Sequence, residues 1–194
     1  MKILITGTGT LLGKTIAKKL ATKYSILATY NKSYPNDLNK IKNIKIIKID
    51  LKNQINLTEK FDVLVHCASL VPALNPTKKM YDQVNYHGFK KLISLCNKMN
   101  CHNIVLISTM SVYGKINSKT ITEKTNFKNP DEYGNTKIKM EKILKKFCND
   151  KNKKGLILRL PGIIGPKSKN NFLSFALNHI KKKKFIQINN PNLK

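Results

Sequence analysis

The chain has 194 residues, 41% of them apolar, which is enough for one domain, or for one domain and part of another, with a full core. Its net charge of +27 comes almost entirely from lysine, and Arg159 is the single arginine. The lysines are scattered over expected helix faces and loops, without the arginine forks and aromatic platforms of nucleic-acid readers. We therefore expect no specific nucleic-acid partner.

The cysteines argue against both disulfides and a metal site. Cys67, Cys96, Cys101 and Cys148 form no CxxC pair and show no metal-ligand spacing. This pattern predicts reduced thiols in a cytoplasmic protein. Met1 and Lys2 lead straight into an expected strand rather than a signal peptide, and no apolar run is long enough to cross a bilayer. We expect no membrane partner.

The first twenty residues predict a strand, a tight turn and a helix. Ile3–Ile5 is a short apolar run, residues 6–10 form a glycine-rich turn, and residues 11–20 switch to helical spacing. Such an opening places backbone N–H groups and a helix N-terminus where they can bind a pyrophosphate. The alternative is an ordinary strand–helix loop that needs glycine for its backbone conformation.

Strands and helices alternate along the rest of the chain. This alternation predicts an α/β fold of the Rossmann type, a doubly wound parallel sheet with helices on both faces and strand order 3-2-1-4-5-6. Further strands are expected at 25–30, 44–49, 61–66, 103–108 and 155–160, with a short one at 185–188. Further helices are expected at about 79–99, 132–148 and 171–180.

Polar clusters gather where the expected strands end. In a parallel sheet these carboxyl ends share one edge, which is where ligands bind. The clusters fall at residues 6–13, 30–33, 50–51, 66–69, 108–111 and 161–165. Their coincidence at one edge favours a real ligand site over a series of unrelated loops.

Tyr133 and Lys137 start the helix that follows the fifth strand, one turn apart on the same face. A nearby ammonium lowers the pKa of a phenol, so Tyr133 is a candidate proton donor and acceptor for alcohol–ketone interconversion. The hydroxyl of Thr109, at the end of the fifth strand, is placed to bind the same substrate oxygen. A solvent-exposed pair is the alternative, because Tyr-x-x-x-Lys is common by chance.

Seven segments in order resemble the extended short-chain dehydrogenase/reductases, in the NAD-dependent epimerase/dehydratase group that acts on nucleotide sugars. Thr6-Gly7 with Gly13 resembles TGxxGxxG, and Tyr133–Lys137 with Glu141 resembles YxxSKxxxE. The other matching segments are Asp50-Leu51, His66–Ser69 (HxAA), Asn85–Gly88 with Leu92 (NxxG…L), Ser108–Gly114 (SSxxVYG) and Leu158–Pro161 with Gly165-Pro166 (LRxxxxxGP).

The resemblance implies roles for these residues. Tyr133 is the implied acid/base, Lys137 binds the nicotinamide ribose and lowers the pKa of Tyr133, and Thr109 is the catalytic Ser/Thr. The cofactor, NAD or NADP, exchanges hydride with a sugar carbon, and the protein supplies orientation and proton transfer. The implied cofactor-binding residues are Gly7, Gly9, Thr10, Leu11, Leu12, Gly13, Asn31, Lys32, Asp50, Leu51, Cys67, Ala68, Ser69, Asn85, Ile107, Tyr133, Lys137 and Pro161.

Two departures from the family pattern concern the cofactor. Thr10 stands where the middle glycine of the turn is expected, and its Cβ crowds the pyrophosphate unless its hydroxyl binds a phosphate. No acidic residue follows the second strand to bind the ribose 2′-hydroxyl. Asn31, Lys32 and Ser33 stand there instead and favour the 2′-phosphate of NADP. A solvated lysine loop is the alternative.

Two further departures concern the reaction and the chain length. Met110 and Ser111 replace the Asp-Glu pair of family 4,6-dehydratases, which leaves epimerase or reductase. We assign residues 1–160 to the NAD(P)-binding domain and 161–194 to the beginning of a substrate lobe that is largely absent. A non-catalytic dinucleotide-binding or interaction protein, or an inactive fragment, is therefore the alternative. The family's homodimer implies pairing through helices 79–99 and 132–148, which here carry many lysines.

His66 and Arg159 look structural rather than catalytic. A histidine at a strand end is more often packed and hydrogen-bonded than reactive. An arginine inside an apolar strand is more often a structural pairing residue than a substrate ligand.

Overall fold

The computed structural model describes residues 1–116, 119–165 and 172–185. They fall into two compact units, Met1–Pro161 and Gly162–Lys194. This division lies one residue from the boundary expected from the sequence. That the second unit begins a substrate lobe stays a prediction.

Six parallel strands form one sheet in the order β3-β2-β1-β4-β5-β6, which confirms the predicted order. After β3 the chain crosses back over β2 and β1 to start β4, so the strand order reverses between β1 and β4 and a crevice opens at the carboxyl ends of these two strands. The strands are β1 (Lys2–Thr6), β2 (Ser25–Tyr30), β3 (Ile44–Lys48), β4 (Val63–His66), β5 (Asn103–Thr109) and β6 (Lys154–Leu160).

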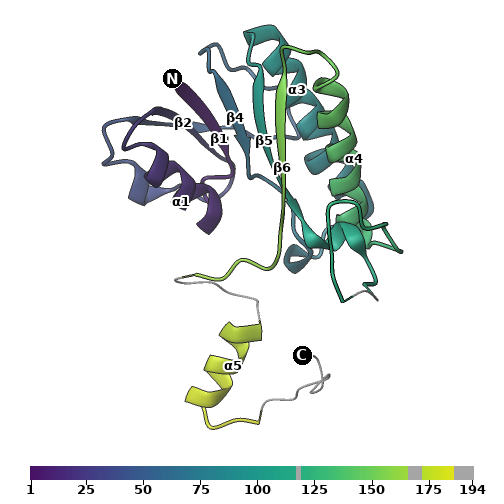
Figure 1. Cartoon of the computed structure of the whole chain (residues 1–194). Helices are drawn as coiled ribbons and strands as arrows, with labels where there is room; N and C mark the ends of the chain where they lie inside the picture. Colours follow the sequence, from purple (N-terminus) through teal and green to yellow (C-terminus); the bar gives the residue numbers. More distant parts are fainter. Residues whose placement is uncertain (117–118, 166–171, 186–194) are drawn as a thin grey trace. The chain divides into compact units, whose positions relative to one another are not determined.

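Helices pack on both faces of the sheet, as expected. Figure 1 shows α3 and α4 together on one side and α1 on the other. The α-helices are α1 (Leu11–Leu20), α2 (Lys78–Tyr81), α3 (Gly88–Met99), α4 (Glu132–Phe147) and, in the second unit, α5 (Phe172–Lys181). Short 3₁₀ turns are η1 (Asn36–Leu38), η2 (Pro72–Leu74) and η4 (Met110–Tyr113).

Alternation of side chains along the strands builds two cores. On β1, Leu4 faces α3 and α4 whereas Ile3 and Ile5 face α1, and all three are buried. The core under α3 and α4 is the larger and includes Phe89 and Met140. The strands are apolar on both faces, as expected of a parallel sheet covered on both sides.

The helix expected at 79–99 is interrupted. Residues Asp82–His87 form a π-helical turn, η3, between α2 and α3. At its end, a Cβ on Gly88 would lie 2.8 Å from Leu51 Cβ, so the chain passes closely over the end of β3 there. Helical periodicity predicts a helix at these positions, but it does not reveal one widened turn within it.

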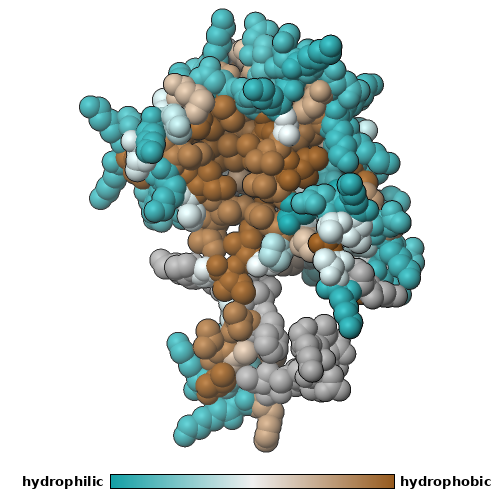
Figure 2. Space-filling model, viewed as in Figure 1, coloured by the Kyte–Doolittle hydropathy of each residue, from teal (hydrophilic) through white to brown (hydrophobic). Residues whose placement is uncertain are grey.

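Strand β6 forms one edge of the sheet, and its outer side chains are poorly covered. Leu156 and Leu158 are 51% and 36% exposed on the face opposite α4. Figure 2 shows apolar side chains gathered over the middle of the sheet on this side. Of the short strand predicted at 185–188, residues 186–188 lie outside those that the structure describes.

Candidate active site

A cleft of about 390 Å³ opens at the carboxyl ends of β1, β2 and β4. The sequence predicts a ligand site at this edge of the sheet. The cleft is lined by Thr6, Gly7, Gly9, Thr10, Thr29, Tyr30, Asn31, Lys32, Ser33, Ile49, Leu51, Ala68, Ser69, Leu70, Leu74 and Val84. The lining combines the glycine turn, the polar loop after β2 and apolar side chains such as Ile49 and Val84.

The glycine turn forms the inner wall because side chains do not fit there. Gly7 has φ +77°, and a Cβ on it would lie 2.7 Å from Ala68 N. A Cβ on Gly13, in the first turn of α1, would lie 2.5 Å from Gly7 O. These approaches bring α1 against the turn, with its N-terminal N–H groups near the cleft. The turn therefore fits a pyrophosphate.

Thr10 differs from its expected role. It is the residue before α1, in extended conformation, and its hydroxyl donates to Gly7 O at 2.8 Å. The hydroxyl proton is thus used within the turn and is not offered to a phosphate. The middle position of the turn therefore carries a Cβ that the family pattern lacks, and Thr10 lines the cleft.

The loop after β2 lies directly against the turn. A Cβ on Gly9 would lie 2.3 Å from Ser33 O, so Gly9 permits this contact. Asn31, Lys32 and Ser33 line the cleft, and no acidic residue is among the described residues that line it. Leu51 also lines it, whereas the Asp50 carboxylate accepts a hydrogen bond from Lys52 N at 2.9 Å and closes a turn.

Thr6 and His66 join the ends of β1 and β4 beneath the cleft. Thr6 Oγ1 lies 2.7 Å from His66 Nδ1 and accepts from Ala68 N at 3.2 Å. The imidazole is fully buried and stacks on Phe89. Burial, and secondarily the charge of Lys137, lower the pKa of His66 to about 3, so the ring is neutral. The expectation that His66 is packed and hydrogen-bonded is confirmed.

Tyr133 lies in the first turn of α4, whose start is capped by the Asp131 carboxylate accepting from Gly134 N at 2.6 Å. Its phenol lies close to the side chain of Ser69, a residue of the cleft wall, and its ring lies 5.9 Å from that of Tyr81. Burial raises the pKa of Tyr133 above its usual 10, Tyr81 and Asp131 add to this, and only the Ser69 hydroxyl opposes it. This direction is opposite to the one expected from the sequence.

Lys137 is buried one turn further along α4. Its Nζ donates to Ile107 O at 2.9 Å and lies 5.7 Å from the centre of the Tyr133 ring. The predicted proximity of ammonium and ring is therefore correct. Burial lowers the pKa of Lys137 to about 8, although Cys67 and Glu141 oppose this. In this structure the ammonium is bound by the Ile107 carbonyl and does not offset the burial of the phenol.

Thr109 ends β5 next to the start of α4. Its Oγ1 accepts from Ser111 N at 3.2 Å and contacts Ser111 Oγ at 3.2 Å, which caps η4. A Cβ on Gly134 would lie 2.4 Å from Ser111 O, so α4 begins directly against this turn. The structure thus brings the segments of Thr109 and Tyr133 together, with the Thr109 hydroxyl engaged locally.

Several residues expected to bind cofactor do not line the cleft. The Asn85 side chain is hydrogen-bonded to the backbone of Leu70, and the Ile107 carbonyl accepts a hydrogen bond from Lys137. Pro161 is exposed at the end of the first unit. Besides these, Leu11, Leu12, Gly13, Asp50, Cys67, Tyr133 and Lys137 lie outside the lining. Conversely, Leu70, Leu74 and Val84 line it without having been predicted, because apolar residues in loops and helices carry no distinctive signal.

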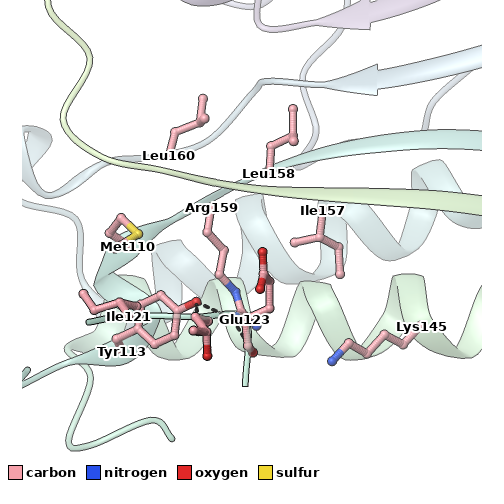
Figure 3. A pocket seen from close by; sticks show the side chains of 10 residues that line it. Met110, Tyr113, Ile121, Glu123, Lys145, Ile157, Leu158, Arg159 and Leu160 are labelled. Carbon is pink, nitrogen blue, oxygen red and sulfur yellow. Dashed lines mark hydrogen bonds between the residues drawn. The ribbon is translucent and has the colours of Figure 1, made fainter. Parts of the chain in front are cut away.

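A second hollow, of about 550 Å³, follows the edge strand β6 (Figure 3). Arg159 points from β6 toward α4, whereas Leu158 and Leu160 point to the other side of the strand. The guanidinium donates to both carboxylate oxygens of Glu141, Nε to Oε1 at 3.0 Å and Nη2 to Oε2 at 2.6 Å, and also to Tyr113 Oη at 2.8 Å. Arg159 is therefore a pairing residue, as expected.

Among the described residues, no group of three or more His, Cys, Asp or Glu side chains is arranged to hold a metal ion. No helix in that part of the chain has the length and apolarity needed to cross a bilayer.

Residues 3–192 match the family described as "NAD dependent epimerase/dehydratase family". Protein CapI of Staphylococcus aureus is 29% identical over 186 residues, 86% of this chain and 55% of that protein. An uncharacterized UDP-glucose epimerase, YtcB of Bacillus subtilis, is 26% identical over 187 residues, 87% of this chain and 58% of that protein. The chain thus spans little more than half the length of these curated relatives.

Solved structures show the same fold. UDP-glucuronic acid 4-epimerase from Bacillus cereus, in complex with UDP-glucuronic acid and NAD, superposes with a TM-score of 0.84 at 22% identity. The superposition covers 95% of this chain and 64% of that one.

Proposed function

Because the chain belongs to the NAD-dependent epimerase/dehydratase family, we propose that it binds NAD(P) and epimerises or reduces a nucleotide sugar. The observation that carries this proposal is the cleft itself. Three glycines permit backbone approaches that no side chain allows, at the carboxyl edge of the sheet, and Ser69 links this cleft to Tyr133. Relatives named as UDP-glucose epimerases support a nucleotide sugar as substrate.

In this proposal Tyr133 transfers the proton at the sugar hydroxyl, and Thr109 binds the same oxygen after its hydroxyl turns away from Ser111. The Lys137 ammonium leaves the Ile107 carbonyl and binds the nicotinamide ribose instead, because the lysine side chain is flexible. The nicotinamide, when bound, supplies hydride transfer. Gly7, Gly9 and the start of α1 hold the pyrophosphate.

We propose NADP as the preferred cofactor. Lys32 and the polar side chains of Asn31 and Ser33 line the cleft beyond β2, where an acidic residue would repel a 2′-phosphate. A titration with NAD(H) and NADP(H) tests this, and Lys32→Met is expected to weaken NADPH binding about tenfold while leaving NADH binding within twofold. Equal losses for the two cofactors would contradict the preference.

A non-catalytic dinucleotide-binding protein is the second candidate. It is favoured by Thr10 at a glycine position and by the raised pKa of Tyr133. Turnover of a panel of UDP-sugars separates it from the enzyme. Activity that Tyr133→Phe abolishes supports the enzyme, and cofactor binding without turnover supports the second candidate.

The main experiment measures cofactor binding by fluorescence titration. Lys137→Ala is expected to weaken NAD(P)H binding at least tenfold, because the ribose loses its ammonium donor. Lys139→Ala, two residues along α4 with its Nζ paired to Asp82, is the control and should bind as the wild type does. Unchanged binding by the Lys137→Ala protein would disprove the ribose role.

We also propose a homodimer through the outer faces of α3 and α4 and a location in the cytoplasm. Between these helices lies a groove of about 480 Å³ with Ile93, Ile143 and Phe147 in its floor, which suits helix packing. The four cysteines are free, as a reducing compartment requires. Sedimentation velocity at several salt concentrations tests the dimer, because the lysines bordering the groove repel one another more at low salt.

A further inference from the structure

Asn85 is buried in the π-helical turn η3, and both polar atoms of its side chain bind one residue. Its Oδ1 accepts from Leu70 N at 2.8 Å, and its Nδ2 donates to Leu70 O at 3.1 Å. This two-point contact fixes the Leu70 peptide groups. Because the amide faces neither the cleft nor solvent, Asn85 acts on the cleft only through Leu70.

Ser69, the neighbour of Leu70, shares that carbonyl. Ser69 Oγ donates to Leu70 O at 3.1 Å, and the same side chain lies close enough to the Tyr133 phenol to lower its pKa. Leu70 O therefore receives two donors, one from Asn85 and one from Ser69. A serine hydroxyl has one proton, so Ser69 cannot donate to Leu70 O and to a phenolate at the same time.

We propose that Asn85 is a positioning residue that leaves the Ser69 proton free to turn from Leu70 O to the Tyr133 oxygen when that oxygen loses its proton. The Asn85 amide keeps Leu70 O hydrogen-bonded after the hydroxyl turns, so no buried carbonyl is left without a donor. The step exchanges one hydrogen bond and breaks no covalent bond. The inference rests on the proposed function in one respect, namely that proton transfer by Tyr133 is what forms the phenolate.

Ser69 is the group that can stabilise the phenolate in this arrangement. The other groups facing Tyr133 are Tyr81 from α2, Asp131 at the start of α4 and Lys137 one turn along α4. Tyr81 and Asp131 raise the pKa of the phenol, and the Lys137 ammonium is bound to Ile107 O. The nearby Ser69 hydroxyl is the group that lowers this pKa, and how strongly it does so depends on the competing Leu70 carbonyl.

The test measures the pKa of Tyr133 in the full chain without cofactor or substrate. Tyrosines are labelled with ¹³C at Cζ, their NMR shifts are followed against pH, and Tyr133→Phe assigns the signal. Ser69→Ala and Asn85→Ala are each expected to raise the pKa of Tyr133 by at least about half a unit, a threefold fall in its ionisation constant. Ser69→Ala removes the hydroxyl, and Asn85→Ala leaves its proton held by Leu70 O, so neither protein has a donor free for the phenolate. Asn97→Ala, which removes a surface amide bound to Lys153 on the same run of helix, is the matched control and should leave this pKa unchanged.

The double variant Ser69→Ala/Asn85→Ala distinguishes positioning from a general structural effect. If Asn85 acts through Ser69, the double variant shifts the pKa no further than Ser69→Ala alone. Additive shifts, or no shift in Asn85→Ala, overturn the proposal. Asn85→Ser replaces Asn85→Ala if the latter does not fold, and an unchanged pKa in Ser69→Ala overturns the proposal by itself. Lack of turnover with these shifts present would contradict the proposed function and not this inference.

Discussion

At the scale of single residues, the sequence predicts the position of Lys137 correctly but not its effect on the pKa of Tyr133. Sequence spacing correctly places Lys137 beneath the Tyr133 ring, since residues four apart share a helix face. Spacing does not predict that the Ile107 carbonyl binds the ammonium, because that contact depends on how α4 packs on β5. The direction of the Tyr133 pKa was wrong for the same reason. Burial is a tertiary property, and here it outweighs the neighbouring cation.

Lys137 predicts a pH dependence of stability. Its pKa is about 8 in the folded chain and 10.5 when unfolded, so the folded state binds fewer protons between these values. The penalty for burying the ammonium is therefore complete below pH 8 and disappears as the pH rises toward 10.5. Lys137→Met, which removes it, should be more stable than the wild type at pH 7 by up to about 3 kcal/mol, with the gain shrinking by pH 10.

Chemical denaturation at the two pH values measures this effect. Lys19→Met, an exposed lysine of α1, is the control for the loss of one charge. If the Lys137→Met protein exceeds the wild type in free energy of unfolding by the same amount at both pH values, burial does not destabilise the ammonium.

At the scale of elements, strand and helix positions followed from periodicity, and the exceptions have local causes. The observed bounds of α1, Leu11–Leu20, and of β2, Ser25–Tyr30, are those expected. The π turn at 82–87 was not predicted, because Asn85 binds Leu70 through a contact between segments distant in sequence. The cleft lining was predicted where glycine or polar residues mark strand ends. It was missed where the lining is apolar, as at Leu74 and Val84.

The ion pair of Arg159 with Glu141 joins β6 to α4 in the interior. Both carboxylate oxygens accept from the guanidinium, and Oε1 also accepts from Ser108 Oγ at 2.5 Å. Arg159→Met leaves the Glu141 carboxylate buried without its cation, so we expect a loss of about 3–5 kcal/mol in the free energy of unfolding. Urea denaturation measures it. The double variant with Glu141→Gln should recover part of the loss, and equal losses in the single and double variants would argue against the pair.

Gly13 tests how α1 is held against the glycine turn. Alanine normally stabilises a helix by about 1 kcal/mol over glycine, but here its Cβ would lie 2.5 Å from Gly7 O. Gly13→Ala is therefore expected to destabilise the chain by about 1–3 kcal/mol and to weaken cofactor binding as α1 moves. Gly162→Ala is the matched control, since a Cβ there meets no atom within 4 Å. A stabilised Gly13→Ala protein would contradict the close approach.

At the scale of the whole molecule, each compact unit has apolar surface. In the first unit, Leu156 and Leu158 of the edge strand are 51% and 36% exposed, and in the second, Leu177 and Ile180 of α5 are 58% and 62% exposed. A free edge and an apolar face together promote association between chains. Length and composition indicate a full core but do not show which face stays uncovered.

This exposure predicts a gain in solubility from one substitution. Leu158→Lys on the edge strand should reduce binding of the dye ANS and raise the protein concentration at which light scattering increases. Ile116→Lys, in an exposed loop, is the matched control and should change both much less. Equal effects of the two substitutions would show that added charge, and not the face of β6, determines association.

The contact between Gly9 and Ser33 couples the glycine turn after β1 to the loop after β2. Because the Ser33 carbonyl lies where a Cβ on Gly9 would stand, neither loop can change its path alone. Grafting the corresponding loop of a dehydrogenase onto this scaffold should therefore fail unless the glycine turn that accompanies it is transplanted too. A lineage exchanging one dinucleotide for the other would have to alter both loops in concert.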